Sequence, residues 1–133
     1  MIFRIIKETD VRAEIKKNDN NLEFKTDERC FILETANNSN DDAVSIARAR
    51  VKPGVTTAWH KLKETDERYI IVSGKGLVEI GDLEPVEVSE GDVIRIPADT
   101  PQRIKNIGIT DLIFFAVCSP RFINTCYINL EKL

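Results

Sequence analysis

The feature that most constrains the fold of this chain is the spacing of its apolar runs. From residue 43 onward, short runs rich in β-branched residues recur at intervals of about ten residues, and turn residues separate them. No segment keeps the 3.6-residue period of a long amphipathic helix. Short strands joined by tight turns are typical of an antiparallel sandwich or a closed barrel, which leaves few exposed sheet edges. The sequence therefore predicts an all-β protein.

The predicted strands cover nearly the whole chain. The polar segment 37–42 is predicted to be a loop, because it contains only asparagine, serine and aspartate. Residues 11–15 also fit one helical turn. In chain order the predicted strands are 3–6, 11–15, 22–25, 30–34, 44–51, 56–62, 68–72, 77–80, 85–88, 93–96, 103–107, 111–118 and 125–130.

Length and charge narrow the class of protein further. A chain of 133 residues fits one domain, 1–133, and no linker interrupts it. We expect the barrel core at 43–118, additional strands in 1–42 and a C-terminal tail at 119–133. The net charge is −3, and the 19 basic residues are dispersed among 22 acidic ones. Because nucleic-acid binding usually needs a concentrated positive field, no nucleic-acid partner is expected.

The N-terminus and the cysteines bear on localisation. Arg4, Lys7 and Glu8 interrupt the apolar start that a signal peptide would need. No stretch approaches the roughly 20 apolar residues of a membrane span. The three cysteines, an odd number, favour reduced thiols over a disulfide framework. We therefore expect a cytoplasmic protein that does not associate with membranes.

The only histidine is the centre of the candidate chemistry. Strand alternation puts His60 and Leu62 on one face, and Glu67 and Tyr69 on one face of the returning strand. If both faces point inward, His60 and Glu67 meet on adjacent strands. A neutral imidazole beside a carboxylate suits a divalent metal ion. Without metal, the same two side chains form a hydrogen-bonded ion pair.

Two spaced patterns around this histidine resemble the motifs of the cupin family. The resemblance covers residues 43–118 and implies a jelly-roll barrel, the double-stranded β-helix. It also implies a homodimer, formed through sheet faces or exchanged N-terminal strands, a role that suits 3–6. The first motif is matched at Gly54, His60, Glu67 and Gly74, and the second at Gly91, Pro97 and Asn106.

Three departures from the family pattern concern the metal site. Leu62 and Gln102 stand where the family has histidines, and Asp99 replaces a glycine. The resemblance therefore implies a weakened divalent metal site (Zn, Ni, Mn or Fe) formed by His60, Glu67 and Gln102. A non-haem iron site with two histidines and one carboxylate cannot be built from a single histidine.

Further residues are candidates for the pocket. Arg48 and Arg50 share a strand face, and if that face is internal they form a clamp for a carboxylate or phosphate. On an outer face they would pair with surface acids instead. A buried Glu67 needs a partner, either a metal or a cation such as Arg50. Leu62 and Tyr69 are also expected to line the pocket.

Three functions remain open at this point. The first is a small-molecule pocket with a divalent metal site of reduced ligand count. The second is a metal-independent isomerase or epimerase, in which His60 is the general base and Tyr69 the general acid. The third is a non-catalytic module that binds or senses a small molecule.

Overall fold

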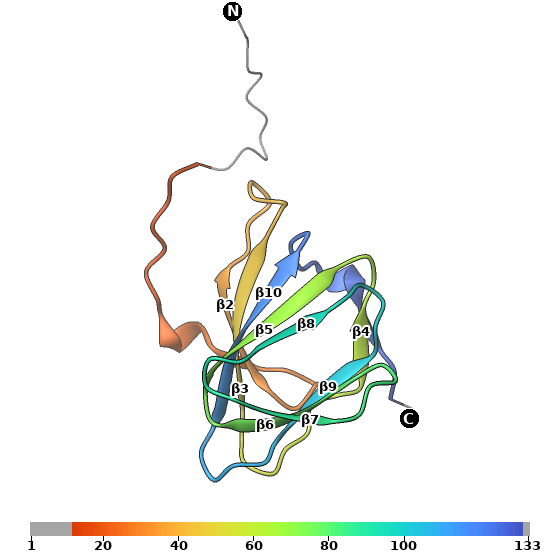
Figure 1. The fold of residues 1–133 in the computed structure, drawn as a ribbon. Coiled ribbons are helices and arrows are strands. Elements are labelled where there is room, and N and C mark those ends of the chain that lie inside the picture. Colours follow the sequence, from red (N-terminus) through yellow and green to blue (C-terminus); the bar gives the residue numbers. More distant parts are fainter. Residues whose placement is uncertain (1–11, 132–133) are drawn as a thin grey trace, which may run out of the picture.

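Two antiparallel sheets make up almost all of the structure, a computed structural model that describes residues 12–131. The double-stranded, jelly-roll-like architecture predicted from the sequence is confirmed (Figure 1). The strands are β1 (Phe24–Lys25), β2 (Phe31–Ala36), β3 (Ser45–Val51), β4 (His60–Leu62), β5 (Asp66–Ser73), β6 (Lys75–Ile80), β7 (Val86–Ser89), β8 (Val93–Ile96), β9 (Gln102–Asn106), β10 (Leu112–Ser119) and β11 (Tyr127–Asn129).

The strand order explains how the motif-bearing strands face one another. The larger sheet has the order β1-β2-β3-β10-β5-β8, and the smaller has the order β11-β4-β9-β6-β7. In Figure 1, β3, β10, β5 and β8 lie side by side in one layer, while β6, β7 and β9 form the other. β5 therefore faces β4 and β9 across the barrel. Consecutive strands often belong to different sheets, as jelly-roll topology requires.

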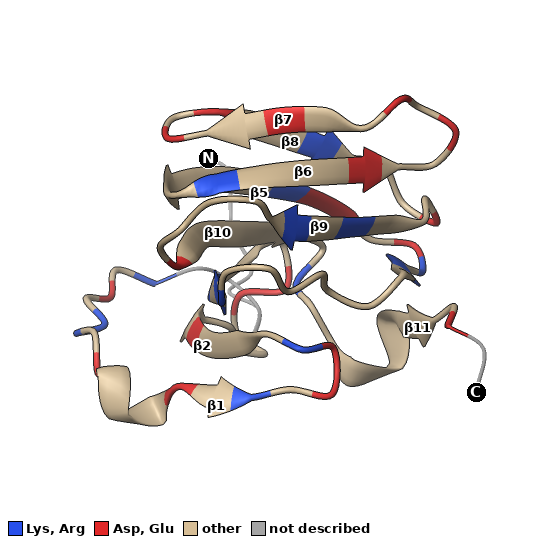
Figure 2. Ribbon diagram, turned by 90° about the horizontal axis from the view of Figure 1, so that it is seen from below, with Lys and Arg blue, Asp and Glu red and all other residues tan. Residues whose placement is uncertain are grey.

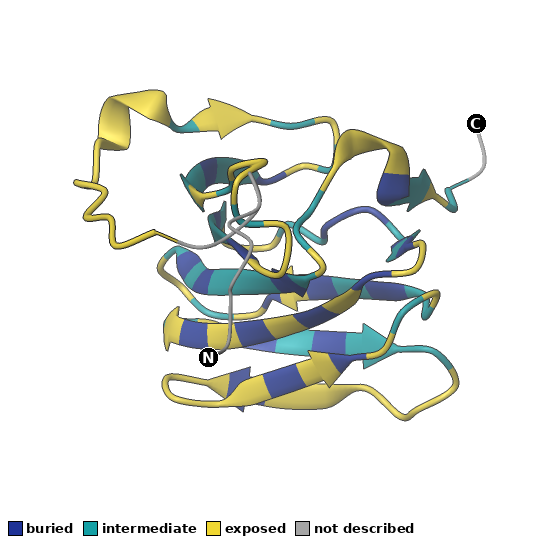
Figure 3. Cartoon of the chain, turned by 90° about the horizontal axis from the view of Figure 1, so that it is seen from above, coloured by how far each residue is buried: buried dark blue, intermediate teal, exposed yellow. Residues whose placement is uncertain are grey.

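The hydrophobic core fills one end of the barrel. Buried and exposed residues alternate strictly along β5 and β8, because successive side chains of a strand point to opposite faces (Figure 3). Ile71, Ile96, Ile104 and Leu112 are each 1% exposed or less and pack together between the sheets. A smaller cluster of Leu62, Cys118 and Cys126 lies apart from this core. The large cluster fills one end of the barrel with apolar side chains, and among the described residues the other end contains only the small cluster.

Most predicted strands are present, with two corrections. Segment 56–62 forms a regular strand only at His60–Leu62. In the residues that precede this strand, the Thr57 N–H donates to β9 and the Ala58 N–H donates to the β1–β2 loop. The segment therefore does not pair along its length with any one strand. Residues 12–15, from the predicted strand 11–15, are exposed and without regular structure. Segment 3–6 lies outside the described residues, and the homodimer stays a prediction.

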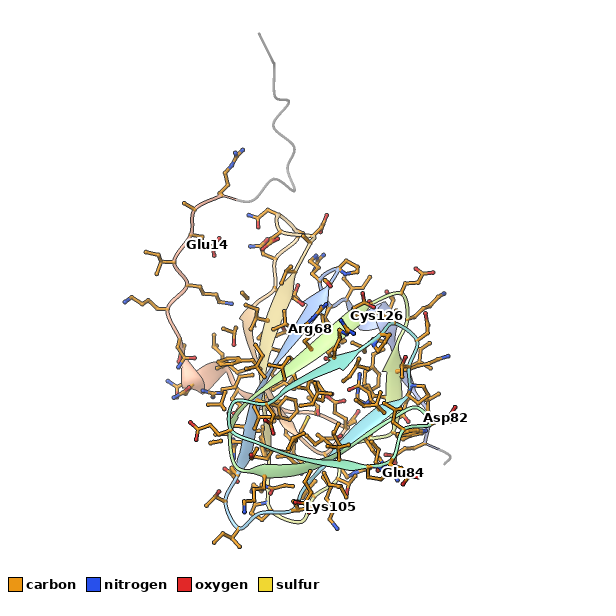
Figure 4. All side chains as sticks on the ribbon, viewed as in Figure 1. Glu14, Arg68, Asp82, Glu84, Lys105 and Cys126 are labelled. Carbon is orange, nitrogen blue, oxygen red and sulfur yellow. The ribbon has the colours of Figure 1, made fainter. Side chains whose placement is uncertain are left out.

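Helix is almost absent from residues 12–131. Two 3₁₀ turns, Asn20–Leu22 and Asn124–Cys126, are present, and no helix there is long and apolar enough to cross a membrane. The three cysteines are all buried and free. Acidic and basic residues are interspersed over both sheets (Figure 2), and exposed side chains such as Asp82, Glu84 and Lys105 lie at the periphery (Figure 4).

Candidate functional site: a cavity around the single histidine

A cavity of about 460 Å³ occupies the end of the barrel that the hydrophobic core leaves open. It lies between the inner faces of β2, β3, β5 and β10 on one side and β4 and β11 on the other. The volume is in the range of small-molecule sites in proteins. Its lining includes the sequence-predicted residues His60, Leu62, Glu67 and Tyr69.

Small residues on the inner face of the larger sheet make this cavity possible. The inward positions of β3 are Ser45, Ala47 and Ala49, and β10 adds Ala116. At the packed end, the corresponding inward positions carry isoleucine, leucine and valine. A pair of sheets about 10 Å apart needs large side chains to fill the space between them. Where these strands supply alanine and serine, the space stays open.

His60 is held in one tautomer. Its side chain is buried, and Nδ1 lies 2.7 Å from the carbonyl oxygen of Ala58. A carbonyl only accepts, so Nδ1 carries a proton, and in the neutral form of the ring the lone pair is on Nε2. Among residues 12–131, no side chain or backbone group bonds to Nε2. The ring stacks on Tyr127, with 4.9 Å between centroids, and this contact fixes its plane.

Glu67, Gln102 and Tyr69 form a buried chain of hydrogen bonds. The Gln102 amide nitrogen donates to Glu67 Oε1 over 2.7 Å, and the Tyr69 hydroxyl donates to Gln102 Oε1. The Cys118 thiol lies 3.6 Å from the other Glu67 oxygen. Burial raises the pKa of Glu67, although the bond from Gln102 and the charge of His60 partly oppose this shift. Burial also raises the pKa of Tyr69 well above its usual value.

The three predicted metal ligands do not fit a metal site. The oxygen of Gln102 already accepts from Tyr69, and its amide nitrogen is the atom directed at Glu67. Gln102 lies behind the cavity wall and is absent from its lining. Within the described part of the chain, no three histidine, cysteine, aspartate or glutamate side chains are grouped so that they could hold an ion. Gln102 instead joins the two sheets.

The pocket assignment of Arg48 and Arg50 was wrong. Both point to the outer face of β3, because the inward positions alternate with them. There Arg50 pairs with Glu23 at 2.5 Å and with Asp111 at 3.2 Å, and Arg48 pairs with Glu23 at 3.4 Å. The hydrogen bond from Arg50 lowers the pKa of Glu23. The predicted partnership between Arg50 and Glu67 is therefore not formed.

Sequence reasoning missed the acidic residues contributed by the N-terminal hairpin. Asp27 and Glu28, on the β1–β2 loop drawn red in Figure 2, and Glu34 of β2 all line the cavity. Glu28 Oε2 lies 4.0 Å from His60 Nδ1. A backbone bond from Ala58 N–H to the Glu28 carbonyl, 3.1 Å long, fixes the loop against the strand that leads to His60. These residues lie outside both motifs, so no local pattern identified them.

Sequence reasoning also missed Tyr127, whose ring lies against the imidazole of His60. Burial, and after it the neighbouring Glu28 carboxylate, raise the pKa of its hydroxyl, so the group stays protonated. The predicted proton donor, Tyr69, has its own hydroxyl engaged with Gln102. Of the two tyrosines in the cavity, Tyr127 is the one that contacts the imidazole.

The two-sheet barrel with a histidine-centred cavity agrees with the comparison to known families. The model of the Cupin domain matches residues 47–118, more than half of the chain. The chain belongs to the cupin family. The predicted resemblance is thereby confirmed, and the matched segment runs from β3 to β10.

Other proteins resemble this chain in part of the sequence or in fold. An uncharacterised protein of Methanocaldococcus jannaschii is 45% identical over 64 residues, which cover 48% of this chain and half of that relative. A predicted oxalate decarboxylase from Thermotoga maritima is 27% identical, with a TM-score of 0.63, over 68% of this chain and 80% of that one. The Streptomyces nucleoside dehydratase Pac13 is 15% identical, with a TM-score of 0.72, over 90% and 94% of the two chains. The last likeness concerns the fold alone.

Proposed function

We propose that this cupin catalyses a metal-independent proton transfer on a small molecule bound in the cavity, with His60 as the general base. The observation that carries the proposal is the fixed tautomer of His60. Its Nδ1 proton is committed to the Ala58 carbonyl, which leaves the Nε2 lone pair available. This is the pattern by which a neutral imidazole is prepared to accept a proton.

The surroundings of the imidazole support this role. When Nε2 takes a proton, the ring becomes positively charged, and Glu28, 4.0 Å from Nδ1, favours that charge. Tyr127, protonated and stacked on the ring, is a candidate to return a proton to the ligand. Removal of a proton by one group and its return by another is the chemistry of isomerases, epimerases and dehydratases, and the dehydratase Pac13 shares this fold.

Solvent exchange tests the proposal directly. The full chain is incubated in D₂O with uridine, glucose, glucosamine and aminoacetone, and ¹H NMR follows the loss of C–H signals or the appearance of new vinylic ones. We expect enzyme-dependent exchange for one of these compounds, and we expect His60→Gln to reduce its rate at least 100-fold, in line with the contribution of a general base of about 10² or more. Tyr127→Phe should reduce the rate less.

Two outcomes would contradict the proposal. If a compound binds and no exchange occurs, the cavity belongs to a binding or sensing module. If EDTA abolishes the exchange and a divalent ion restores it, a metal takes part. The imidazole itself gives an independent check, because the chain contains a single histidine. ¹⁵N NMR at pH 8 should show the proton on Nδ1.

A further inference from the structure

The charges that line the cavity are all of one kind. Four carboxyl groups contribute to its wall, the carboxylates of Asp27, Glu28 and Glu34 and the more deeply buried carboxyl of Glu67, and no lysine or arginine among the described residues does. None of the four forms a salt bridge with a lysine or arginine of residues 12–131. Among the described residues that line the cavity, the one side chain that can take up a positive charge is the imidazole of His60, which is neutral when it is ready to act as a base. Residues 12–131 therefore supply no lysine or arginine as a counter-charge to these four groups.

Elsewhere in the same fold, acidic side chains are paired with arginine. Glu23 bonds to Arg50, Glu79 to Arg103 and Glu131 to Arg29. On β3 the arginines point outward and the alanines point inward, so this strand places its two cations away from the cavity. Partly buried carboxylates that lack a positively charged partner are costly, even where a neutral group such as the Cys30 thiol donates a hydrogen bond to Glu28. A ligand that brings a positive charge would relieve that cost.

Aromatic rings complete the lining. Phe24, Tyr69, Phe114, Phe122 and Tyr127 contribute to the same wall. The faces of aromatic rings attract cations, and rings combined with carboxylates are a usual way to bind an ammonium group. An anionic ligand would gain nothing from either feature. Asp27 is exposed and Glu28 is half-buried, so the negative potential extends from the mouth toward His60.

We propose that the ligand of this cavity is an organic cation, a small molecule with a protonated amine held between the carboxylates and the aromatic rings. This inference shares with the proposed function only the assumption that a small molecule binds in this cavity. It specifies the ligand class and is independent of whether His60 acts as a base. An organic ammonium group also suits the site better than a metal ion, because the described carboxylates do not converge in a group of three that could hold one.

Three probes of equal shape and different charge test the proposal. Benzylamine, benzyl alcohol and benzoate are titrated into the full chain at low ionic strength and neutral pH, and binding is measured by calorimetry or ligand-observed NMR. We expect benzylamine to bind at least tenfold more tightly than benzyl alcohol, and benzoate not to bind. The proposal is overturned if benzyl alcohol or benzoate binds as tightly as benzylamine, or if benzylamine does not bind at 10 mM.

Matched variants locate the effect in the cavity. Glu28→Gln and Glu34→Gln should each weaken benzylamine binding at least fivefold and change benzyl alcohol binding less than twofold. Glu87→Gln, on the exposed strand β7, removes the same charge outside the cavity and should leave both affinities unchanged. An equal loss in Glu87→Gln would mean that general charge attraction is responsible, and it would contradict the proposal.

A last variant separates this inference from the proposed function. His60→Gln should keep the preference for benzylamine while losing proton exchange. If the unchanged protein shows no preference for the amine but exchanges protons on a neutral compound, and His60→Gln loses that exchange, only the ligand class is wrong. If the preference is present and no compound exchanges, only the catalytic role of His60 is wrong.

Discussion

At the scale of single residues, the chemistry of the cavity depends on which atoms are already engaged. His60 gives its Nδ1 proton to a backbone carbonyl, Tyr69 gives its proton to Gln102, and Gln102 gives an N–H to Glu67. Each bond removes one group from the set that can act on a ligand. The His60 Nε2, by contrast, makes no hydrogen bond with any of residues 12–131. The residue types alone, one histidine near one glutamate, do not distinguish a general base from a metal ligand.

The buried Glu67 carboxyl predicts a pH dependence of stability. Burial raises its pKa above the ordinary value of 4.5, so the folded chain binds this proton more tightly than the unfolded chain does. The contribution to the free energy of unfolding is therefore full below pH 4.5 and is lost as pH rises through the folded pKa. Glu67→Gln should flatten this decline. Urea unfolding at pH 5, 6, 7 and 8 measures the slope.

A control on the surface makes this result specific. Glu87→Gln, which removes an exposed carboxylate, should keep the slope of the unchanged protein. If Glu67→Gln shows the same decline with pH as the unchanged protein, the carboxyl of Glu67 does not hold its proton in the folded state.

At the scale of elements, two glycines of the family motifs differ in what surrounds them. Gly74, between β5 and β6, and Gly91, before β8, have φ values of +90° and +88°. Both conformations are unfavourable for a residue with a Cβ atom. A Cβ atom added at Gly74 would also lie 2.8 Å from the Asp111 backbone oxygen and 2.9 Å from the Leu112 Cα. A Cβ atom added at Gly91 would meet no atom within 4 Å.

This matched pair predicts two different costs for the same substitution. Gly91→Ala should lower the free energy of unfolding by about 1 to 2 kcal/mol, the usual cost of a left-handed backbone conformation. Gly74→Ala carries that cost and a backbone clash, so it should lower the value by more. Chemical denaturation of both variants measures the difference. Equal losses would show that the chain moves aside at Gly74 without cost.

At the scale of the whole molecule, Gln102 connects the two sheets where the hydrophobic core ends. It belongs to β9 of the smaller sheet, and both of its partners, Glu67 and Tyr69, belong to β5 of the larger sheet. Its side chain is 1% exposed, so its hydrogen bonds are made out of contact with water. The family pattern suggested a ligand at this position, and the packing makes it a structural link.

Removal of this link should be costly. Gln102→Leu keeps the volume similar and leaves one oxygen of Glu67 and the hydroxyl of Tyr69 without partners. At about 1 to 3 kcal/mol for each unsatisfied buried group, we expect a loss of roughly 3 kcal/mol in the free energy of unfolding. In the Tyr69→Phe background, the loss should be smaller by about 1 kcal/mol, since one partner is already absent. Additive losses in this double-mutant cycle would contradict the link to Tyr69.

The sequence by itself determined most of the strands and which neighbours share a strand face with His60 and with Glu67. It predicted that the two residues meet on adjacent strands, whereas the structure places them on β4 and β5, which belong to different sheets. Period-two alternation and turn residues are local properties, and both motifs lie on contiguous segments. Whether β3 turns its alanines or its arginines inward was decided only by the tertiary structure, because alternation defines two faces without saying which one is internal. Asp27, Glu28, Glu34 and Tyr127 likewise reach the cavity only through sheet topology, which joins segments distant in the chain. The strands and turns of the barrel follow from local sequence patterns. The charge and the open volume of its cavity depend on which distant segments pack together.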